Sequence, residues 1–226
     1  MTTAVIEETL EGMDLNERNV RKWGQAAFGI SAYGDATVKV PTTVEELFNP
    51  TTHKPTAWPQ GVKRMGWITT DGMSLGKDVS SNNTMGLQSL YPVRTDMESI
   101  EETLGVNFLE ANGFTEALYR LLPVEAWPET KEGAYGFKGA GAADIPDYVL
   151  WLVLKDGAGS NAVYKHRVIH RSRINGLEDR NQNRGDPETF GCTFGLFRDP
   201  VSGLVDVEAS DGPGKPTHLA APPTTP

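Results

Sequence analysis

Four histidines and one cysteine are the side chains of this sequence best suited to metal binding or catalysis. His53 and His218 occur in proline-rich segments, which are typical of loops. His166 and His170 share one face of a strand-like segment, but four residues of extended chain separate them by about 13 Å. One metal ion cannot bind both of these side chains. The sequence therefore predicts no metal site.

The remaining motifs indicate neither a catalytic nucleophile nor a cofactor. Cys192 lies on the apolar face of an alternating strand pattern, where a thiol packs as a small hydrophobic group. Two glycine pairs, Gly139 with Gly141 and Gly133 with Gly136, lack the preceding strand and following helix of a dinucleotide fingerprint. We expect a protein that is not an enzyme and that binds no cofactor.

The most concentrated charge is a basic run between residues 165 and 173. Period-two alternation places four of these side chains on one face of a strand: Lys165, Arg167, Arg171 and Arg173. Such a face can be solvated, can pair with carboxylates of a neighbouring subunit, or can contact a polyanion. General nucleic-acid binding is disfavoured because the chain carries a net charge of −9.

Composition favours a β-rich fold of one domain, or two at most. The chain has 226 residues, of which 24 are glycine and 15 proline, more than a helical bundle tolerates. The longest apolar run, Tyr148 to Leu154, is too short to span a bilayer, and acidic Glu7 and Glu8 are unlike a secretory signal. We expect no membrane anchor and a protein made in a cytoplasm.

Hydrophobic patterning predicts mainly strands, and capping signals predict few helices. The strand segments are Ala26–Ala32, Ala36–Val40, Val62–Thr70 before a turn at Asp71-Gly72, Ile100–Phe108, Tyr148–Leu154, Val163–Ile174, Thr189–Arg198 and Leu204–Val207. The helical segments are about Leu15–Trp23, a brief turn after Thr43, and Gly113–Leu122, whose apolar residues fall on one face.

A long polar segment, Met73 to Met97, separates two of these strands. It is expected to be two extended arms joined by a mobile excursion, with Ser80, Ser81, Asn82, Asn83 and Thr84 at its centre. The chain as a whole divides into an N-terminal arm (1–23), a β domain (24–208) and a proline-rich C-terminal extension (209–226).

Three short motifs follow one another along the chain. They are Gly24-Gln25-Ala26-Ala27-Phe28 leading to Val40-Pro41-Thr42-Thr43, then Met65-Gly66-Trp67-Ile68-Thr69-Thr70-Asp71-Gly72-Met73, then Glu110-Ala111-Asn112-Gly113 before the amphipathic helix. In this order they resemble the major tail proteins, the tail-tube subunits, of long-tailed, non-contractile bacteriophages, especially those of actinobacteria. The resemblance covers roughly Gly24 to Arg198.

The resemblance implies a fold and a function. The fold would be a tail-tube-type β-sandwich or open barrel with one flanking α-helix and extended N- and C-terminal arms. Copies would form rings, hexameric as the resemblance implies, that stack into the tube through which DNA passes without specific binding. The implied partners are further copies, the tape-measure protein, the tail terminator and distal tail proteins, and the implied location is the virion tail, assembled in the host cytoplasm.

Three groups of residues are candidate contacts between subunits. They are Leu10, Met13, Leu15 and Trp23 in the arm; Ser80, Ser81, Asn82, Asn83 and Thr84 in the polar segment; and Lys165, Arg167, Arg171 and Arg173 in the basic strand. Two alternatives remain open. One is a tail terminator or head–tail joining protein of the same fold, and the other is a carbohydrate-binding β-sandwich using Trp58, Trp67, Trp127 and Trp151 as sugar platforms.

Overall fold

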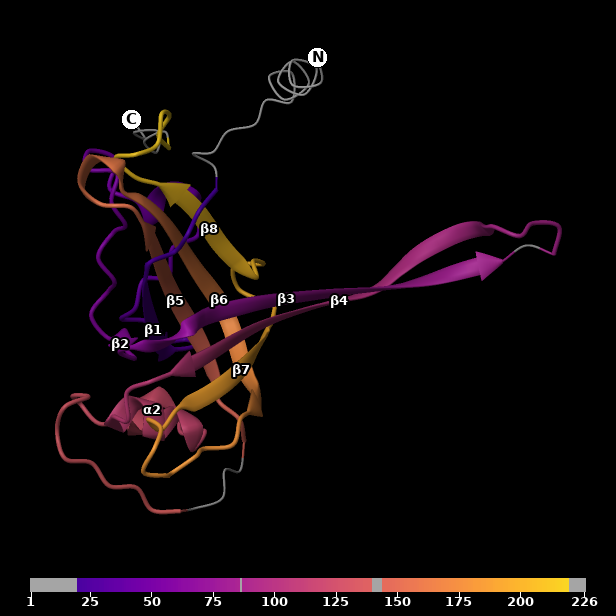
Figure 1. Ribbon diagram of the computed structural model, residues 1–226. Helices are drawn as coiled ribbons and strands as arrows, with labels where there is room; N and C mark the ends of the chain where they lie inside the picture. The colour runs from indigo at the N-terminus through magenta and orange to yellow at the C-terminus, as the bar shows by residue number, and fades with distance from the viewer. Residues whose placement is uncertain (1–19, 86, 140–143, 220–226) are drawn as a thin grey trace, which may run out of the picture.

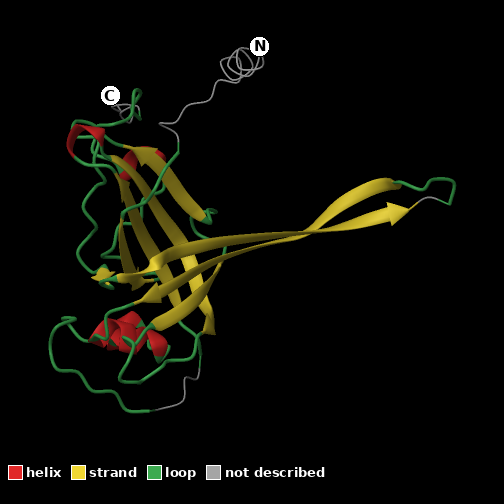
Figure 2. Cartoon of the chain, in the orientation of Figure 1, coloured by secondary structure: helices red, strands yellow, loops and turns green. Residues whose placement is uncertain are grey.

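The computed structural model describes residues 20–85, 87–139 and 144–219, and in these residues the fold is mainly β, as the patterning predicts (Figures 1 and 2). One antiparallel sheet contains all eight named strands. The strands are β1 (Gln25–Ala32), β2 (Lys63–Arg64), β3 (Ile68–Met85), β4 (Pro92–Phe108), β5 (Asp147–Asp156), β6 (Val163–Leu177), β7 (Phe190–Leu196) and β8 (Asp206–Asp211). The described helices are α2 (Gly113–Tyr119) and the 3-10 turns η2 (Val44–Leu47), η3 (Val124–Ala126) and η4 (Gly159–Asn161).

The strand order is β2-β1-β5-β6-β7-β4-β3, and β6 has two partners along the same edge. Its first part, Tyr164 to Ile169, pairs with β8, and its second part, Ser172 to Leu177, pairs with β7. Three predicted strands, which became β5, β6 and β7, are therefore confirmed at the centre of the sheet. β5 is a continuous apolar run and β7 alternates large apolar with small residues, and both patterns are typical of strands that are buried on at least one face.

The sheet curls until its distant strands meet. Phe28 of β1 packs edge-to-face on Phe108 of β4, with ring centroids 5.3 Å apart, although β5, β6 and β7 lie between these strands in the sheet. The link from β2 to β3 joins the two sides, because the Met65 amide donates to the Phe28 carbonyl and the Leu109 amide donates to the Trp67 carbonyl. The result is an open barrel made from a single curled sheet.

The main core fills the concave face of this barrel, and α2 covers one end of it (Figure 1). Phe114, Ala117 and Leu118 of α2 pack there with side chains from β1, β4, β5, β6 and β7. A smaller core on the other face joins η2 to β5, β6 and β8 through residues that include Leu47, Trp151 and Val168. The predicted amphipathic helix is thus confirmed, and its apolar face packs into the main core on the concave face of the sheet.

The predicted helix boundaries need correction at the C-terminal end. Asn112 caps the helix by accepting hydrogen bonds from the Phe114 and Thr115 amides, but the helix ends at Tyr119 rather than at Leu122. Leu121 adopts a left-handed conformation with φ of 56°, and Pro123 follows shortly after. Leu121 and Leu122 still contact the main core, so they share the apolar face without extending the helix.

Two of the predicted β segments are wrong in detail. Ala36 to Val40 forms a turn followed by irregular chain, because the Asp35 carboxylate accepts hydrogen bonds from the amide and hydroxyl of Thr37. Asp71-Gly72 lies inside β3, where the pairing with β4 shifts between Ile68 and Met73. Gly72 has a φ of 74°, so the local turn chemistry produces a β-bulge instead of a chain reversal.

Most of the predicted N-terminal helix, about Leu15 to Trp23, lies outside the described residues. Residues 20 to 24 lie within them and form no helix. At the other end, β8 continues to Asp211, past the expected domain boundary at 208. The helical turn predicted after Thr43 is confirmed as η2, with a capping box between Thr43 and Glu46.

Asp199 fastens the turn before β8 to the end of β1. Its carboxylate accepts hydrogen bonds from the Tyr33 hydroxyl at 2.7 Å and from the Ser202 hydroxyl and amide at 2.6 Å and 2.8 Å. Burial alone would raise the pKa of Asp199, but the hydrogen bonds from Ser202, Tyr33 and the Val201 amide hold it well below the usual range for an aspartate.

We expect Asp199→Asn to destabilise the protein at pH 7 by about 1–2 kcal/mol, because it removes charge-assisted hydrogen bonds. The folded-state pKa lies below the unfolded value of about 3.9, so the stabilisation is fully present above about pH 5 and is lost as the pH falls through the folded-state pKa. Urea unfolding of both proteins at pH 7 and pH 3 measures this. An equal difference at the two pH values would contradict the assignment.

Candidate interaction surface

Strands β3 and β4 form a hairpin that projects far from the barrel (Figure 1). Their pairing runs from Ile68 opposite Phe108 to Met85 opposite Pro92. The inner part of β4, from Glu102 to Phe108, also pairs with β7. The outer part of β4 pairs only with β3 in the part of the chain that the structure describes. The outer half of the hairpin is therefore a two-stranded ribbon with both faces open to solvent.

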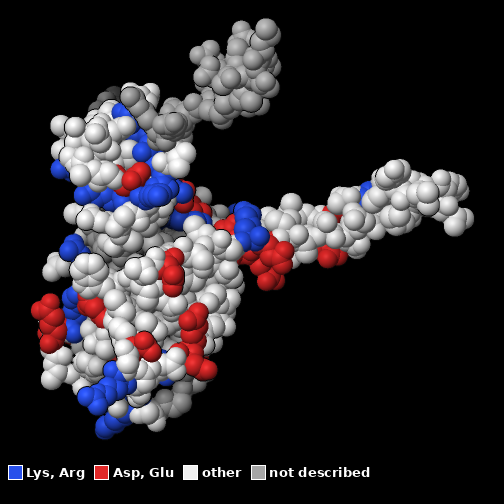
Figure 3. All heavy atoms as spheres, in the orientation of Figure 1, with Lys and Arg blue, Asp and Glu red and all other residues white. Residues whose placement is uncertain are grey.

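The ribbon exposes large apolar side chains. Val79, Met97 and Ile100 are 49%, 66% and 48% exposed, and Leu75, at the base of the ribbon, is 53% exposed. At the tip, Leu87 and Leu90 are almost fully exposed and Tyr91 is 80% exposed. Only a few charged groups interrupt the outer part, and Figure 3 shows it largely uncharged, with charged side chains gathered near its base. Exposed apolar clusters of this kind mark sites where proteins bind one another.

The apolar side chains continue a face that is buried inside the barrel. Leu75 is paired with Leu104, which is fully buried, and Val79 is paired with Ile100 four positions further out on the same face. The ion pair of Lys77 and Glu102 lies between these two apolar pairs. Directly paired residues, and residues two apart, share one face of a sheet. The core-facing side of the sheet therefore runs outward along the ribbon, where nothing in the described residues covers it.

The expected polar excursion is instead regular β-structure. Ser80 to Thr84, expected at the centre of a mobile loop, lie within β3. The Ser80 and Ser99 hydroxyls are hydrogen-bonded at 2.9 Å, and the Thr95 hydroxyl donates to Asn83 Oδ1 at 2.7 Å. Cross-strand bonds between polar side chains thus replace the hydrophobic contacts that normally make a strand visible in a sequence.

The basic strand residues find their carboxylate partners within the chain. Lys165 pairs with Glu208 at 2.8 Å, and Arg167 pairs with Asp206 at 2.6 Å. Arg171 and Arg173 both pair with the carboxylate of Asp147, at 2.9 Å and 2.8 Å. The structure therefore provides intramolecular partners for all four cations, and pairing with a neighbouring subunit remains a hypothesis.

One of these cations also reaches the base of the hairpin. The Arg167 guanidinium lies 3.8 Å from the Glu102 carboxylate, which in turn pairs with Lys77 of β3. Arg167 is largely buried, with a side chain only 12% exposed. These alternating charges connect β6 and β8 to β3 and β4 and favour a fixed direction of the hairpin relative to the barrel.

The motifs that carry the phage resemblance contact one another. The Trp67 amide donates to Glu110 Oε1 at 3.0 Å, and Asn112 Nδ2 donates to the Met65 carbonyl at 3.1 Å. Gly66 has a φ of 98°, and the Glu110 carboxylate occupies the space that a Cβ at this position would need. These motifs join the start of β3 to the start of α2.

The tryptophans do not form a sugar-binding platform. Trp151 and Trp127 are buried in different cores, at 1% and 6% exposure. Trp58 is half-buried and donates to His166 Nε2, whereas Trp67 is 74% exposed. A carbohydrate platform needs several aromatic faces on one accessible surface, and these side chains do not share one.

Of the arm candidates, Leu10, Met13 and Leu15 lie outside the described residues, and Trp23 is 37% exposed. The side chains considered for chemistry are mostly buried. Burial raises the pKa of the Cys192 thiol to about 12 and lowers the pKa of His166 and His170 below their usual value.

Comparison with models of protein families and with curated proteins finds no match to this chain. None of the helices within residues 20–85, 87–139 and 144–219 is both long and apolar enough to cross a membrane.

Proposed function

We propose that this chain is a structural subunit that polymerises with copies of itself into the tail tube of a long-tailed bacteriophage. The observation that carries the proposal is the projecting β3–β4 ribbon, whose exposed apolar face continues the core of the barrel. In a monomer the ribbon adds little to the stability of the fold, because a two-stranded ribbon with an uncovered apolar face is marginally stable in water. A neighbouring copy that covered the ribbon would remove this cost.

The proposed assembly uses the ribbon as the contact between stacked rings. The barrel would lie within a ring, and the ribbon would reach the barrel of a subunit in the next ring and bury Leu75, Val79 and Ile100 against it. Every subunit offers the same ribbon and the same receiving surface, so contacts of this head-to-tail type propagate into a tube. Hexameric rings remain the expectation carried by the resemblance to tail-tube proteins.

The charge of the chain is compatible with a DNA conduit. A net charge of −9 disfavours tight phosphate binding, so DNA would slide through such a tube without specific contacts. The partners of this role would be further copies, a tape-measure protein, a tail terminator and distal tail proteins. The location would be the virion tail, after assembly in the cytoplasm of the host.

Negative-stain electron microscopy and sedimentation of the purified full-length protein, over a range of concentrations, test the proposal. We expect tubes of uniform diameter that lengthen as the concentration rises. Closed rings that never stack would favour the tail-terminator alternative. A protein that stays monomeric at all concentrations, with its ribbon intact, would contradict self-assembly.

A further inference from the structure

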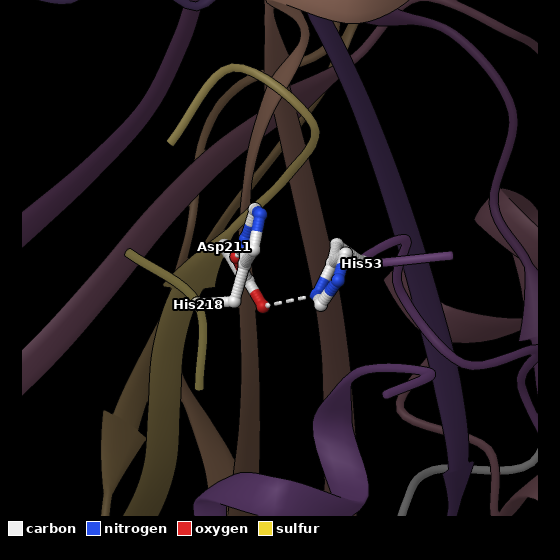
Figure 4. Close-up of side chains that lie close together, drawn as sticks. All are labelled: His53, Asp211 and His218. Atoms are coloured by element: carbon white, nitrogen blue, oxygen red, sulfur yellow. Dashed lines mark hydrogen bonds and ion pairs between the residues drawn. The ribbon is translucent and has the colours of Figure 1, made fainter. Parts of the chain in front are cut away.

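Three chemically active side chains from distant parts of the chain meet at one end of the barrel (Figure 4). His53 comes from the loop after η2, Asp211 is the last residue of β8, and His218 lies in the C-terminal segment. His53 Nδ1 lies 3.4 Å from Asp211 Oδ2, and His218 Nδ1 lies 2.8 Å from Asp211 Oδ1. The two imidazole rings stack on each other with centroids 3.5 Å apart.

The loop that carries His53 is held in place by its own backbone hydrogen bonds. The His53 amide donates to the Asn49 carbonyl and the Asn49 amide donates to the Lys54 carbonyl, both at 2.9 Å, so the loop is closed on itself. His53 itself has a φ of 53°, a left-handed conformation that is uncommon for residues other than glycine. A non-glycine residue held in this region is often found at functional sites.

The backbone after β8 turns back so that His218 reaches the same place. Gly212 has a φ of 149° and lies so close to the Ala162 carbonyl that a side chain would not fit there. The Gly214 amide then donates to the same carbonyl at 3.0 Å. Leu219 contacts the smaller core just beyond His218, which holds this segment against the barrel.

Asp211 provides a buried anionic centre for the two imidazoles. Asp211 is only 1% exposed, and its carboxylate also accepts hydrogen bonds from the Gly212 amide at 2.7 Å and the Leu219 amide at 3.4 Å. Burial alone would raise the pKa of Asp211, but the hydrogen bonds from His218, Gly212 and Leu219 lower it below the usual value. The carboxylate is therefore ionised at neutral pH.

Two imidazole nitrogens and one carboxylate oxygen are a donor set that suits zinc and related divalent transition metals. The ligand atoms of these three residues all lie within 4.8 Å of one another. Tetrahedral coordination at 2.0–2.1 Å requires donors about 3.3 Å apart, which is close to the distances already present. The His53 and His218 side chains are 24% and 32% exposed, so an ion can enter from solvent.

We propose that His53 Nδ1, the Asp211 carboxylate and His218 Nδ1 bind one divalent transition-metal ion of the zinc type. The rings are now stacked, with 15° between their planes, so at least one imidazole has to turn out of the stack before both in-plane nitrogen lone pairs point at the ion. A water molecule or a ligand from another chain completes the tetrahedron. The bound ion fastens the C-terminal segment to the barrel, a role separate from the proposed assembly through the ribbon.

Isothermal titration of the full-length, chelator-treated protein with Zn²⁺, and the visible absorption spectrum with Co²⁺, test the site. We expect one ion per chain and a Co²⁺ spectrum of tetrahedral type. His218→Gln is expected to weaken binding roughly tenfold or more, and the His53→Gln/His218→Gln double variant roughly 100-fold or more, because a metal ligand is lost each time. Lys215→Gln, in the same segment but without a ligand atom, is the matched control and should bind as the wild type does.

Thermal melting provides an independent readout. Zn²⁺ should raise the melting temperature of the wild type and of Lys215→Gln, but not that of the double variant, because only an ion bound to the folded state stabilises it. Circular dichroism in the presence of chelator checks that each variant is folded, and His218→Gln alone suffices if the double variant is not. Unchanged affinity in His218→Gln, or a wild type that binds neither ion and melts identically with and without Zn²⁺, would overturn the proposal.

Discussion

Replacing Val79 and Ile100 together by glutamate is expected to abolish tube formation while the subunit remains folded. These residues face each other across the ribbon and lie beyond Glu102, the last β4 residue that pairs with β7. Each half-exposed side chain would contribute up to about 1.5–3 kcal/mol if a neighbouring copy buried it, and burial of a carboxylate adds a further cost. Because about 1.4 kcal/mol is tenfold in an equilibrium constant, the concentration needed for assembly should rise at least about 100-fold.

The matched control is Ser80→Glu/Ser99→Glu, because Ser80 and Ser99 are also directly paired but occupy the neighbouring position, on the opposite face of the ribbon. It introduces the same two charges at the same distance from the barrel. Electron microscopy and sedimentation velocity measure assembly, and circular dichroism measures folding. Normal tubes from Val79→Glu/Ile100→Glu would contradict the role of the apolar face, and equal loss of assembly in both variants would assign the effect to charge alone.

Truncating Leu118 to alanine is expected to lower the free energy of unfolding by about 2–5 kcal/mol. Leu118 is fully buried in the main core, where it contributes to the contact between α2 and the barrel. The substitution removes apolar contacts and leaves a cavity that the surrounding strands can only partly fill. Urea unfolding of the isolated subunit, followed by circular dichroism, measures the change.

Leu121→Ala is the control for this truncation. The residue change is identical, but Leu121 is only partly buried and lies after the end of α2. Its replacement should therefore cost clearly less than that of Leu118. If the two variants had equal stability, or if Leu118→Ala unfolded like the wild type, α2 would not be anchored in the way the structure indicates.

Elements of the fold that depend on local signals could be predicted from the amino-acid pattern. The apolar run of β5 and the alternation of β7 identify strands because each strand has to match a buried face with its own side chains. The start of α2 is equally local, since Asn112 and the apolar residues after it form the cap and the packed face within one short segment. The mainly β fold with one amphipathic helix follows from these signals.

The outer part of the hairpin has no such local signal in its sequence. Its outer strands are exposed on both faces, so no burial imposes the alternation that marks a strand, and Ser80 to Thr84 are typical of a loop by composition. Asp71-Gly72 favours a tight turn in isolation, but pairing of β3 with β4 on both sides of it makes it a bulge. In both places the partner strand decides the conformation.

Contacts between side chains that are distant in the sequence depend on how the segments pack in three dimensions. His53 and Asp211 are separated by 158 positions, and Arg167 finds Glu102 only because the curled sheet brings β6 close to the base of the hairpin. Proline-rich surroundings of His53 and His218 correctly indicate irregular structure, but they carry no information about the Asp211 carboxylate that both rings contact. The physical reason is that local propensity acts over a few residues, whereas a site or a surface is made by packing between segments that the chain itself keeps far apart.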